Sequence, residues 1–334
     1  METNDPNISI ISMNSYISIA SLIFMKFYQQ IIILIIFSLL IFFSTFNFAL
    51  RLYRADYFYK QVVKSKINSD FKEMFLNYQK VFAYAPNEIF YQKKYADDLV
   101  LVANFLPEKE KIFLLNQAIE KLEEINQRKE IFQYTWSLAN LLSLKANSTK
   151  NKQDFEKAEK TFKHLNEISP YYPIYYKDWV KLEIFKEDFE NAEKLCFQAL
   201  SVLPPASEPH KERKAKERAE IYEFLGQIYF KKNELEKAVE AYQEALKLAP
   251  LSKINLHKKI ADIYYLQGSF DKAIERNLHG YHLNPQDPVW SFALSFLYQE
   301  KGEGEQAKKW AKICADLKPE DAEINEFIAK ILNT

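Results

Sequence analysis

Residues 219–252, AEIYEFLGQIYFKKNELEKAVEAYQEALKLAPLS, decide the predicted fold. Small residues in this stretch, Ala238 and Ala245, would let two antiparallel helices approach closely, where bulky side chains would hold them apart. Large aromatic side chains would fill the holes that the small residues leave, and they are Tyr222, Tyr229 and Tyr242. Pro250 cannot continue a helix and predicts a turn at the end of the second helix. The stretch therefore predicts a helical hairpin.

The same pattern recurs along the chain at a period of 34–35 residues. Good matches lie at 173–206, 254–287 and 288–321, and a weaker one lies at 55–88. Their small positions and final prolines are Ala192, Ala199, Pro204, Ala273, Gly280, Pro285, Ala307, Cys314 and Pro319. Two divergent units are expected between them, one through Ala118 and one from Trp136 to Pro170. A single hairpin cannot bury both of its faces, so the units must stack.

The spacing Tyr222-x-x-Leu225-Gly226-x-x-Tyr229, followed by Ala238, Tyr242, Ala245 and Pro250, resembles the tetratricopeptide repeat (TPR), with tyrosine in the tryptophan position. The resemblance implies an all-α fold, a TPR α-solenoid of stacked antiparallel hairpins. With the apolar segment described below, the predicted fold adds an N-terminal transmembrane helix.

Residues 31–50, IIILIIFSLLIFFSTFNFAL, contain no charged residue. Twenty apolar residues are long enough to span a bilayer core of about 30 Å, so we predict a transmembrane helix. A cleaved signal peptide is the rival interpretation, but it would need a shorter apolar region and a small-residue cleavage site. The segment runs instead through Phe46 and Phe48 into Arg51, which favours an uncleaved anchor.

Residues 6–25, within the N-terminal segment 1–30, also lack charge but contain Asn14 and five serines. Three interpretations stay open for them: a second span, an interfacial helix, or an upstream extension of a chain that starts at Met25. One cation, Lys26, precedes the strong span, and five follow it, at Arg51, Arg54, Lys60, Lys64 and Lys66. The positive-inside rule then favours a cytoplasmic C-terminal domain, whereas a single span with a cytoplasmic N-terminus would export it.

The predicted organisation beyond the span has four parts. TPR-like units occupy 55–203, a charged, proline-led linker 204–218, regular TPR units 219–321, and a capping helix 322–334. The linker could also be the extended start of the next helix. The capping helix places Ile324, Phe327, Ile328 and Ile331 on one face.

Composition argues against several function classes. Lys+Arg and Asp+Glu both number 45, so the chain has no overall positive charge that would indicate nucleic-acid binding. Cys196 and Cys314 fall at small-residue positions of second helices and are interpreted as buried packing residues. His279 and His282 lie three residues apart, but no further ligand is evident for a metal. No phosphate-loop or nucleophile motif occurs. We therefore predict no catalytic residue, cofactor or metal, and a protein that is not an enzyme.

In the TPR family the first helix of each hairpin lines a concave groove. Transferring this register implies a groove for a protein or peptide partner, lined by Lys177, Lys181, Glu223, Gln227, Phe230, Lys258, Asp262, Tyr265, Phe292 and Phe296. For any one of these residues, simple exposure to solvent is an equally good interpretation. The predicted function is a membrane-anchored interaction scaffold.

A second resemblance covers roughly residues 31–204. The membrane segment runs into RLYRADYFYK (51–60), and FAYAP (82–86), NEIFYQKKYAD (87–97) and SPYYPIYYKDWVKLEIFKEDFENAEK (169–194) follow. This arrangement resembles the last span and TPR tail of bacterial O-antigen ligase-like or polymerase-like proteins. Those proteins need many spans and an external catalytic loop, which are missing here. The alternative function is therefore an accessory or truncated part of a cell-envelope polysaccharide system.

Overall fold

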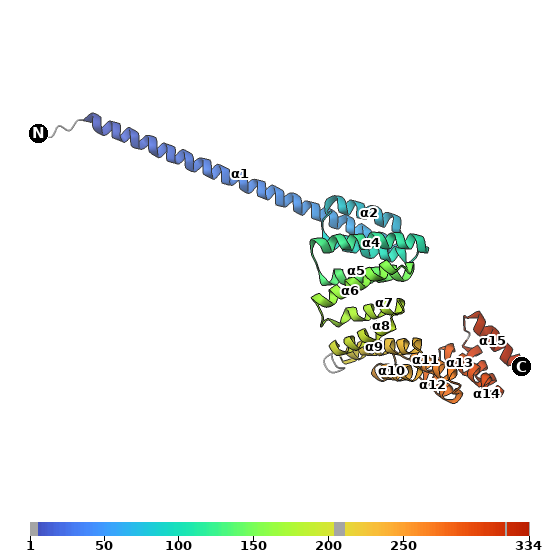
Figure 1. The fold of residues 1–334 in the computed structure, drawn as a ribbon. Coiled ribbons are helices and arrows are strands. Elements are labelled where there is room, and N and C mark those ends of the chain that lie inside the picture. Colours follow the sequence, from blue (N-terminus) through green and yellow to red (C-terminus); the bar gives the residue numbers. More distant parts are fainter. Residues whose placement is uncertain (1–5, 204–210, 318, 334) are drawn as a thin grey trace. The chain divides into compact units, whose positions relative to one another are not determined.

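The computed structural model describes residues 6–203, 211–317 and 319–333 (Figure 1). All regular secondary structure in these residues is helical. The chain divides into two compact units, Met1–Leu106 and Pro107–Thr334.

The first unit is dominated by α1 (Pro6–Ile67), a single helix of 62 residues. Residues 27–49 of α1 are exposed on every side, although they are mostly apolar and contain no charged residue. Within the described residues, Phe27–Ile67 is the one helical stretch long and apolar enough to cross a membrane, and a signal segment near an N-terminus would meet the same criteria. The predicted span and the first helix of the first hairpin are therefore parts of one continuous helix.

The C-terminal part of α1 packs against α2 (Phe71–Tyr84), and α3 (Ile89–Ala103) follows. Tyr78 of α2 is 1% exposed, and its hydroxyl donates to Asp98 of α3 over 2.8 Å. Lys66 of α1 forms an ion pair with the same carboxylate. Burial and the adjacent Asp98 raise the pKa of Tyr78, so its hydroxyl keeps its proton. One partly buried network thus joins all three helices of this unit.

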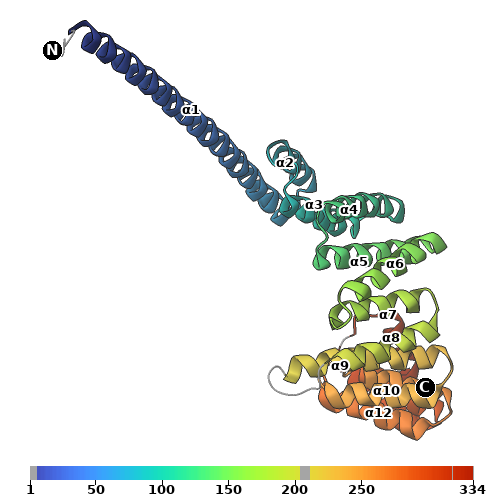
Figure 2. The ribbon, with the colours of Figure 1, turned by 60° about the vertical axis from the view of Figure 1, so that its left-hand side comes forward.

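The second unit is a succession of helical hairpins. Its helices are α4 (Glu108–Arg128), α5 (Phe132–Thr149), α6 (Lys152–Ile168), α7 (Tyr176–Phe185), α8 (Phe189–Val202), α9 (Lys211–Lys231), α10 (Leu235–Leu248), α11 (Leu256–Leu266), α12 (Phe270–Leu283), α13 (Pro288–Glu300), α14 (Gly304–Asp316) and α15 (Ala322–Asn333), with a short 3₁₀ turn at Pro173–Tyr175. From α5 onward the helices pack as pairs, α5 with α6 through α13 with α14, and each pair also contacts the next. Figures 1 and 2 show α5–α6, α7–α8 and α9–α10 lying side by side in this order.

The turn inside each of the hairpins α7–α8, α9–α10, α11–α12 and α13–α14 repeats one backbone conformation. A residue with positive φ ends the first helix at Glu187, Asn233, Gly268 and Gly302. In the α11–α12 turn, the Gly268 amide donates to the Tyr265 carbonyl, and the Ser269 amide donates to the Tyr264 carbonyl. These bonds satisfy carbonyl groups that the end of a helix leaves free. The recurrence of this turn makes successive hairpins structurally equivalent.

The seams between paired helices contain the small residues that the sequence predicts. Ala158, Ala192, Ala238, Ala273 and Ala307 of the second helices are all fully buried. Cys196 and Cys314 are also fully buried and unpaired, and burial raises the pKa of both thiols. They act as small packing residues, in agreement with their interpretation from the sequence.

Residues 211–218, predicted as part of a linker, are the first two turns of α9. The segment KERKAKER contains strong helix formers and neither glycine nor proline, so its charge does not prevent a helix. Pro204 and the rest of the predicted linker, 204–210, lie outside the described residues. The predicted capping helix corresponds to α15, which buries Ile328 and Ile331 against α14.

Candidate partner-binding site

The ten predicted groove residues all lie on the first helices of four consecutive hairpins. Lys177 and Lys181 are on α7; Glu223, Gln227 and Phe230 are on α9; Lys258, Asp262 and Tyr265 are on α11; and Phe292 and Phe296 are on α13. All ten are therefore on first helices, but their side chains differ in what they contact.

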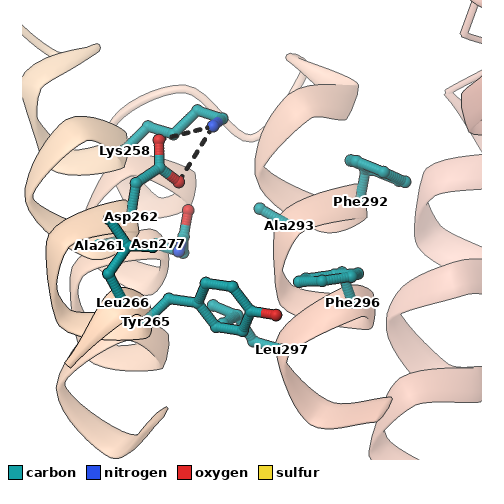
Figure 3. Close-up of a pocket in the computed structure, with 10 residues that line it drawn as sticks. All are labelled: Lys258, Ala261, Asp262, Tyr265, Leu266, Asn277, Phe292, Ala293, Phe296 and Leu297. Atoms are coloured by element: carbon teal, nitrogen blue, oxygen red, sulfur yellow. Dashed lines mark hydrogen bonds and ion pairs between the residues drawn. The ribbon is translucent and has the colours of Figure 1, made fainter. Parts of the chain in front are cut away.

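Five of the ten residues line one pocket of about 350 Å³ between α11, α12 and α13. They are Lys258, Asp262, Tyr265, Phe292 and Phe296. Figure 3 shows the Tyr265 side chain extending from α11 toward Phe296 of α13. The volume lies at the lower end of the range for small-ligand sites, about 300–1,000 Å³. The pocket therefore has room for one large side chain.

Three of the ten lining residues are aromatic: Tyr265 of α11, and Phe292 and Phe296 on the α13 wall of the pocket. The rings of Tyr265 and Phe296 are 5.5 Å apart in an edge-to-face arrangement. Phe327 of α15 packs behind this wall, with its ring centroid 5.2 Å from that of Phe292 and 6.1 Å from that of Phe296. Such pairs hold each other in place, so α15 supports the α13 wall in addition to capping the stack.

The polar side of the pocket carries a local ion pair. Lys258 Nζ lies 3.1 Å and 2.9 Å from the two Asp262 carboxylate oxygens, one helical turn away (Figure 3). Both side chains are largely exposed, so the pair contributes little to stability. It leaves this edge of the pocket close to neutral, and an apolar group can approach the rings without meeting an unpaired charge.

The acidic residue predicted on α9 is engaged inside the molecule. Glu223 forms ion pairs of 2.9 Å with both Lys253 and Lys259. Burial alone would raise the pKa of the Glu223 carboxyl, but hydrogen bonds from the two lysines outweigh it and hold that pKa below its usual value. Glu223 is therefore a charged structural link between α9 and the start of the next hairpin. Gln227 and Phe230 are partly buried and do not line this pocket.

The two predicted cations on α7 also have partners within the chain. Lys177 pairs with Glu220 of α9, and Lys181 lies 3.0 Å from Asp178. Their charges are therefore compensated within the chain. Lys177 instead connects two neighbouring hairpins.

Sequence reasoning missed Asn277 of α12, a buried polar residue that lines the pocket, because it considered only first helices. Asn277 is 2% exposed. The signal was present in the repeat register: thirty-five residues earlier, the equivalent position is Tyr242. Asn277 is smaller than Tyr242, and this difference between equivalent positions predicts a gap in the second unit.

The histidines form no metal site in the described part of the chain, where no group of three or more potential ligand residues gathers. His257 is buried and its ring stacks on that of His279, with centroids 5.8 Å apart. Burial, followed by the positive Arg276 and by His279, lowers the pKa of His257 to about 4. His257 is therefore a neutral packing residue near pH 7.

Comparisons with known proteins support the fold. Residues 219–252 match the tetratricopeptide repeat family. No curated protein matches the sequence. Among solved structures, BtubC (BKLC) from P. vanneervenii shares 16% identity over 66% of this chain and 93% of its own, with a TM-score of 0.50. PilF of Pseudomonas aeruginosa shares 12% identity over 72% of this chain and 99% of its own, with a TM-score of 0.45.

A third structure, YrrB, is described as a TPR protein with an unusual peptide-binding site. It shares 16% identity over 63% of this chain and 97% of its own, with a TM-score of 0.44. These matches lend no support to the resemblance to O-antigen ligase-like proteins, which stays a prediction from the sequence. Residues 219–252 are a tetratricopeptide repeat, set in an all-α solenoid of stacked helical hairpins.

Proposed function

We propose that this protein is a membrane-anchored scaffold that binds a segment of a partner protein on the first-helix side of its hairpins. The single observation that carries the proposal is the aromatic pocket between α11, α12 and α13. The repeat register predicts five of its lining residues without reference to any pocket.

The chemistry of the pocket suits a protein segment. Tyr265, Phe292 and Phe296 are only partly covered, so their rings offer apolar area to an incoming chain. Aromatic anchors in pockets supply most of the energy of many protein interfaces. The Lys258–Asp262 pair offers charged groups beside them for a polar backbone. An extended peptide or a helix can use both kinds of contact.

The long helix α1 supports the anchored part of the proposal. Its exposed apolar residues 27–49 would be solvated by lipid, since about 20 such residues span the hydrocarbon layer. An anchor would confine the scaffold to one surface and raise its effective concentration for partners on that surface.

The test is affinity capture of the full chain from native membranes after crosslinking. The double variant Tyr265→Ala/Phe296→Ala is compared with Phe197→Ala, which removes a half-exposed ring from the second helix α8. We expect the pocket variant to capture each specific partner with a yield at least about tenfold lower than wild type, because removal of a hot-spot pair lowers affinity by at least that factor. Circular dichroism should show retained helix in both variants. An equal set of partners for wild type and pocket variant would contradict the proposal.

A further inference from the structure

Two adjacent hairpins, α9–α10 and α11–α12, carry different residues at equivalent positions of the seam between their helices. In the first, Gly226 of α9 faces Tyr242 of α10, and a Cβ atom placed on Gly226 would lie 2.4 Å from the tyrosine ring. Tyr242 is 3% exposed, so its ring occupies the seam completely. The glycine is required because no larger residue leaves space for the ring.

The next hairpin has no aromatic ring at the equivalent position. Thirty-five residues on, Ala261 of α11 takes the place of Gly226, and Asn277 of α12 takes the place of Tyr242. Both replacements line the 350 Å³ pocket. The pocket is therefore located where the preceding unit keeps an internal aromatic ring, because the second unit has Asn277 instead of a ring at that position.

Asn277 places a hydrogen-bond acceptor without a donor in the lining of the pocket. Its Nδ2 donates to the Ala273 carbonyl over 3.0 Å, which sets the orientation of the amide because the oxygen cannot donate there. Its Oδ1 is buried and accepts no hydrogen bond from any described residue. A buried acceptor without a partner is unfavourable, and a donor that arrives with a ligand would remove this penalty.

We propose that the pocket receives one aromatic side chain of the partner that carries a hydrogen-bond donor, a tryptophan or a tyrosine, and that its N–H or O–H donates to Asn277 Oδ1. This inference rests on the proposed function and names the partner chemistry. The incoming ring takes the space that Tyr242 occupies in the preceding hairpin.

The pocket walls and the acceptor together select this side chain. Tyr265, Phe292 and Phe296 favour a ring over an aliphatic chain, because aromatic pairs pack edge to face. Phenylalanine would fill the same space but leave Asn277 Oδ1 without a donor. A charged side chain would lose its hydration on entering a site lined by three rings, and this desolvation costs free energy.

The inference is tested with the full chain in detergent micelles, panned against a displayed library of random 12-residue peptides. We expect enriched peptides to share a tryptophan or tyrosine at one position. Replacing that residue with its donor-free counterpart, naphthylalanine or phenylalanine, should weaken binding about tenfold or more. In Asn277→Leu, the same peptide exchange should change affinity less than threefold. The difference between these two measurements isolates the hydrogen bond.

A second variant tests the missing ring. Ala261→Gly/Asn277→Tyr rebuilds the Gly226–Tyr242 pair inside the second hairpin, and should fill the pocket and abolish binding while thermal unfolding is unchanged or shifted upward. Asn277→Leu should likewise keep or raise the unfolding temperature, because it removes a buried unpaired acceptor. If Asn277 had a purely structural role, Asn277→Leu would lower the unfolding temperature and leave the selectivity for peptides unchanged.

The outcomes separate the two proposals. Enrichment of peptides without a shared tryptophan or tyrosine, or binding that survives Ala261→Gly/Asn277→Tyr, overturns the inference about the side chain only. Failure to enrich any peptide, together with partner capture that ignores Tyr265→Ala/Phe296→Ala, overturns both.

Discussion

Replacing Trp290 with alanine is expected to lower the free energy of unfolding of the C-terminal hairpins by about 3–5 kcal/mol. Trp290 begins α13 and is 1% exposed. Its ring lies against Gly280 of α12, where an added Cβ atom would be 2.3 Å from the ring. Removal of the indole leaves a cavity between two hairpins, and the glycine cannot fill it.

Hydrogen exchange is the suitable measurement, because stacked repeats open locally and need not unfold as one unit. Amides of α12 and α13 should exchange far faster in Trp290→Ala, whereas those of α5 and α6 should be little affected. Phe197→Ala serves as the control, since a ring that is 52% exposed should cost much less. Equal protection of α12 in wild type and Trp290→Ala would show that this contact does not stabilise the stack.

Introducing arginine at both Leu39 and Leu40 is expected to release the full chain from the membrane. Both side chains are 61% exposed on α1 and lie near the middle of the predicted span. Each arginine at a bilayer centre costs about 2.5–3.5 kcal/mol, so the pair costs about 5–7 kcal/mol. This cost is large enough to prevent stable insertion.

The measurement is alkaline extraction of membranes followed by detection of the chain in pellet and supernatant. The matched control is Val63→Arg, at a residue that is 40% exposed on the same helix but beyond the apolar stretch, and it should stay in the pellet. Sequencing the N-terminus of the mature chain completes the test. A chain that starts after residue 50 would identify a cleaved signal segment and contradict the anchor.

The fold could be predicted because its determinants are local and repeated. Buried alanines such as Ala238 and Ala273 recur at a fixed period, and each marks a helix seam. The continuity of α1 was also readable, since residues 31–67 contain no glycine or proline to end a helix. The charge change at Arg51 does not end the helix, which continues into the first hairpin. Residues 211–218 take the form of the alternative left open for the linker, the extended start of the next helix.

The candidate site was only partly predictable. Helical register gave the first-helix residues, but it could not show that Glu220, 43 residues further on, compensates Lys177. Such ion pairs depend on how one hairpin packs on the next. Asn277 was missed for a different reason: it lies on a second helix, at the position where the preceding hairpin carries the ring of Tyr242.

The most direct test of the account is a photocrosslinking amino acid placed at Phe296 or at Phe197 in the full chain within native membranes. The proposed binding face predicts a partner adduct from Phe296, lost when Ala261→Gly/Asn277→Tyr is added, and none from Phe197. Adducts of equal yield from both positions, or from Phe197 alone, would contradict a partner-binding face at the α11–α13 pocket.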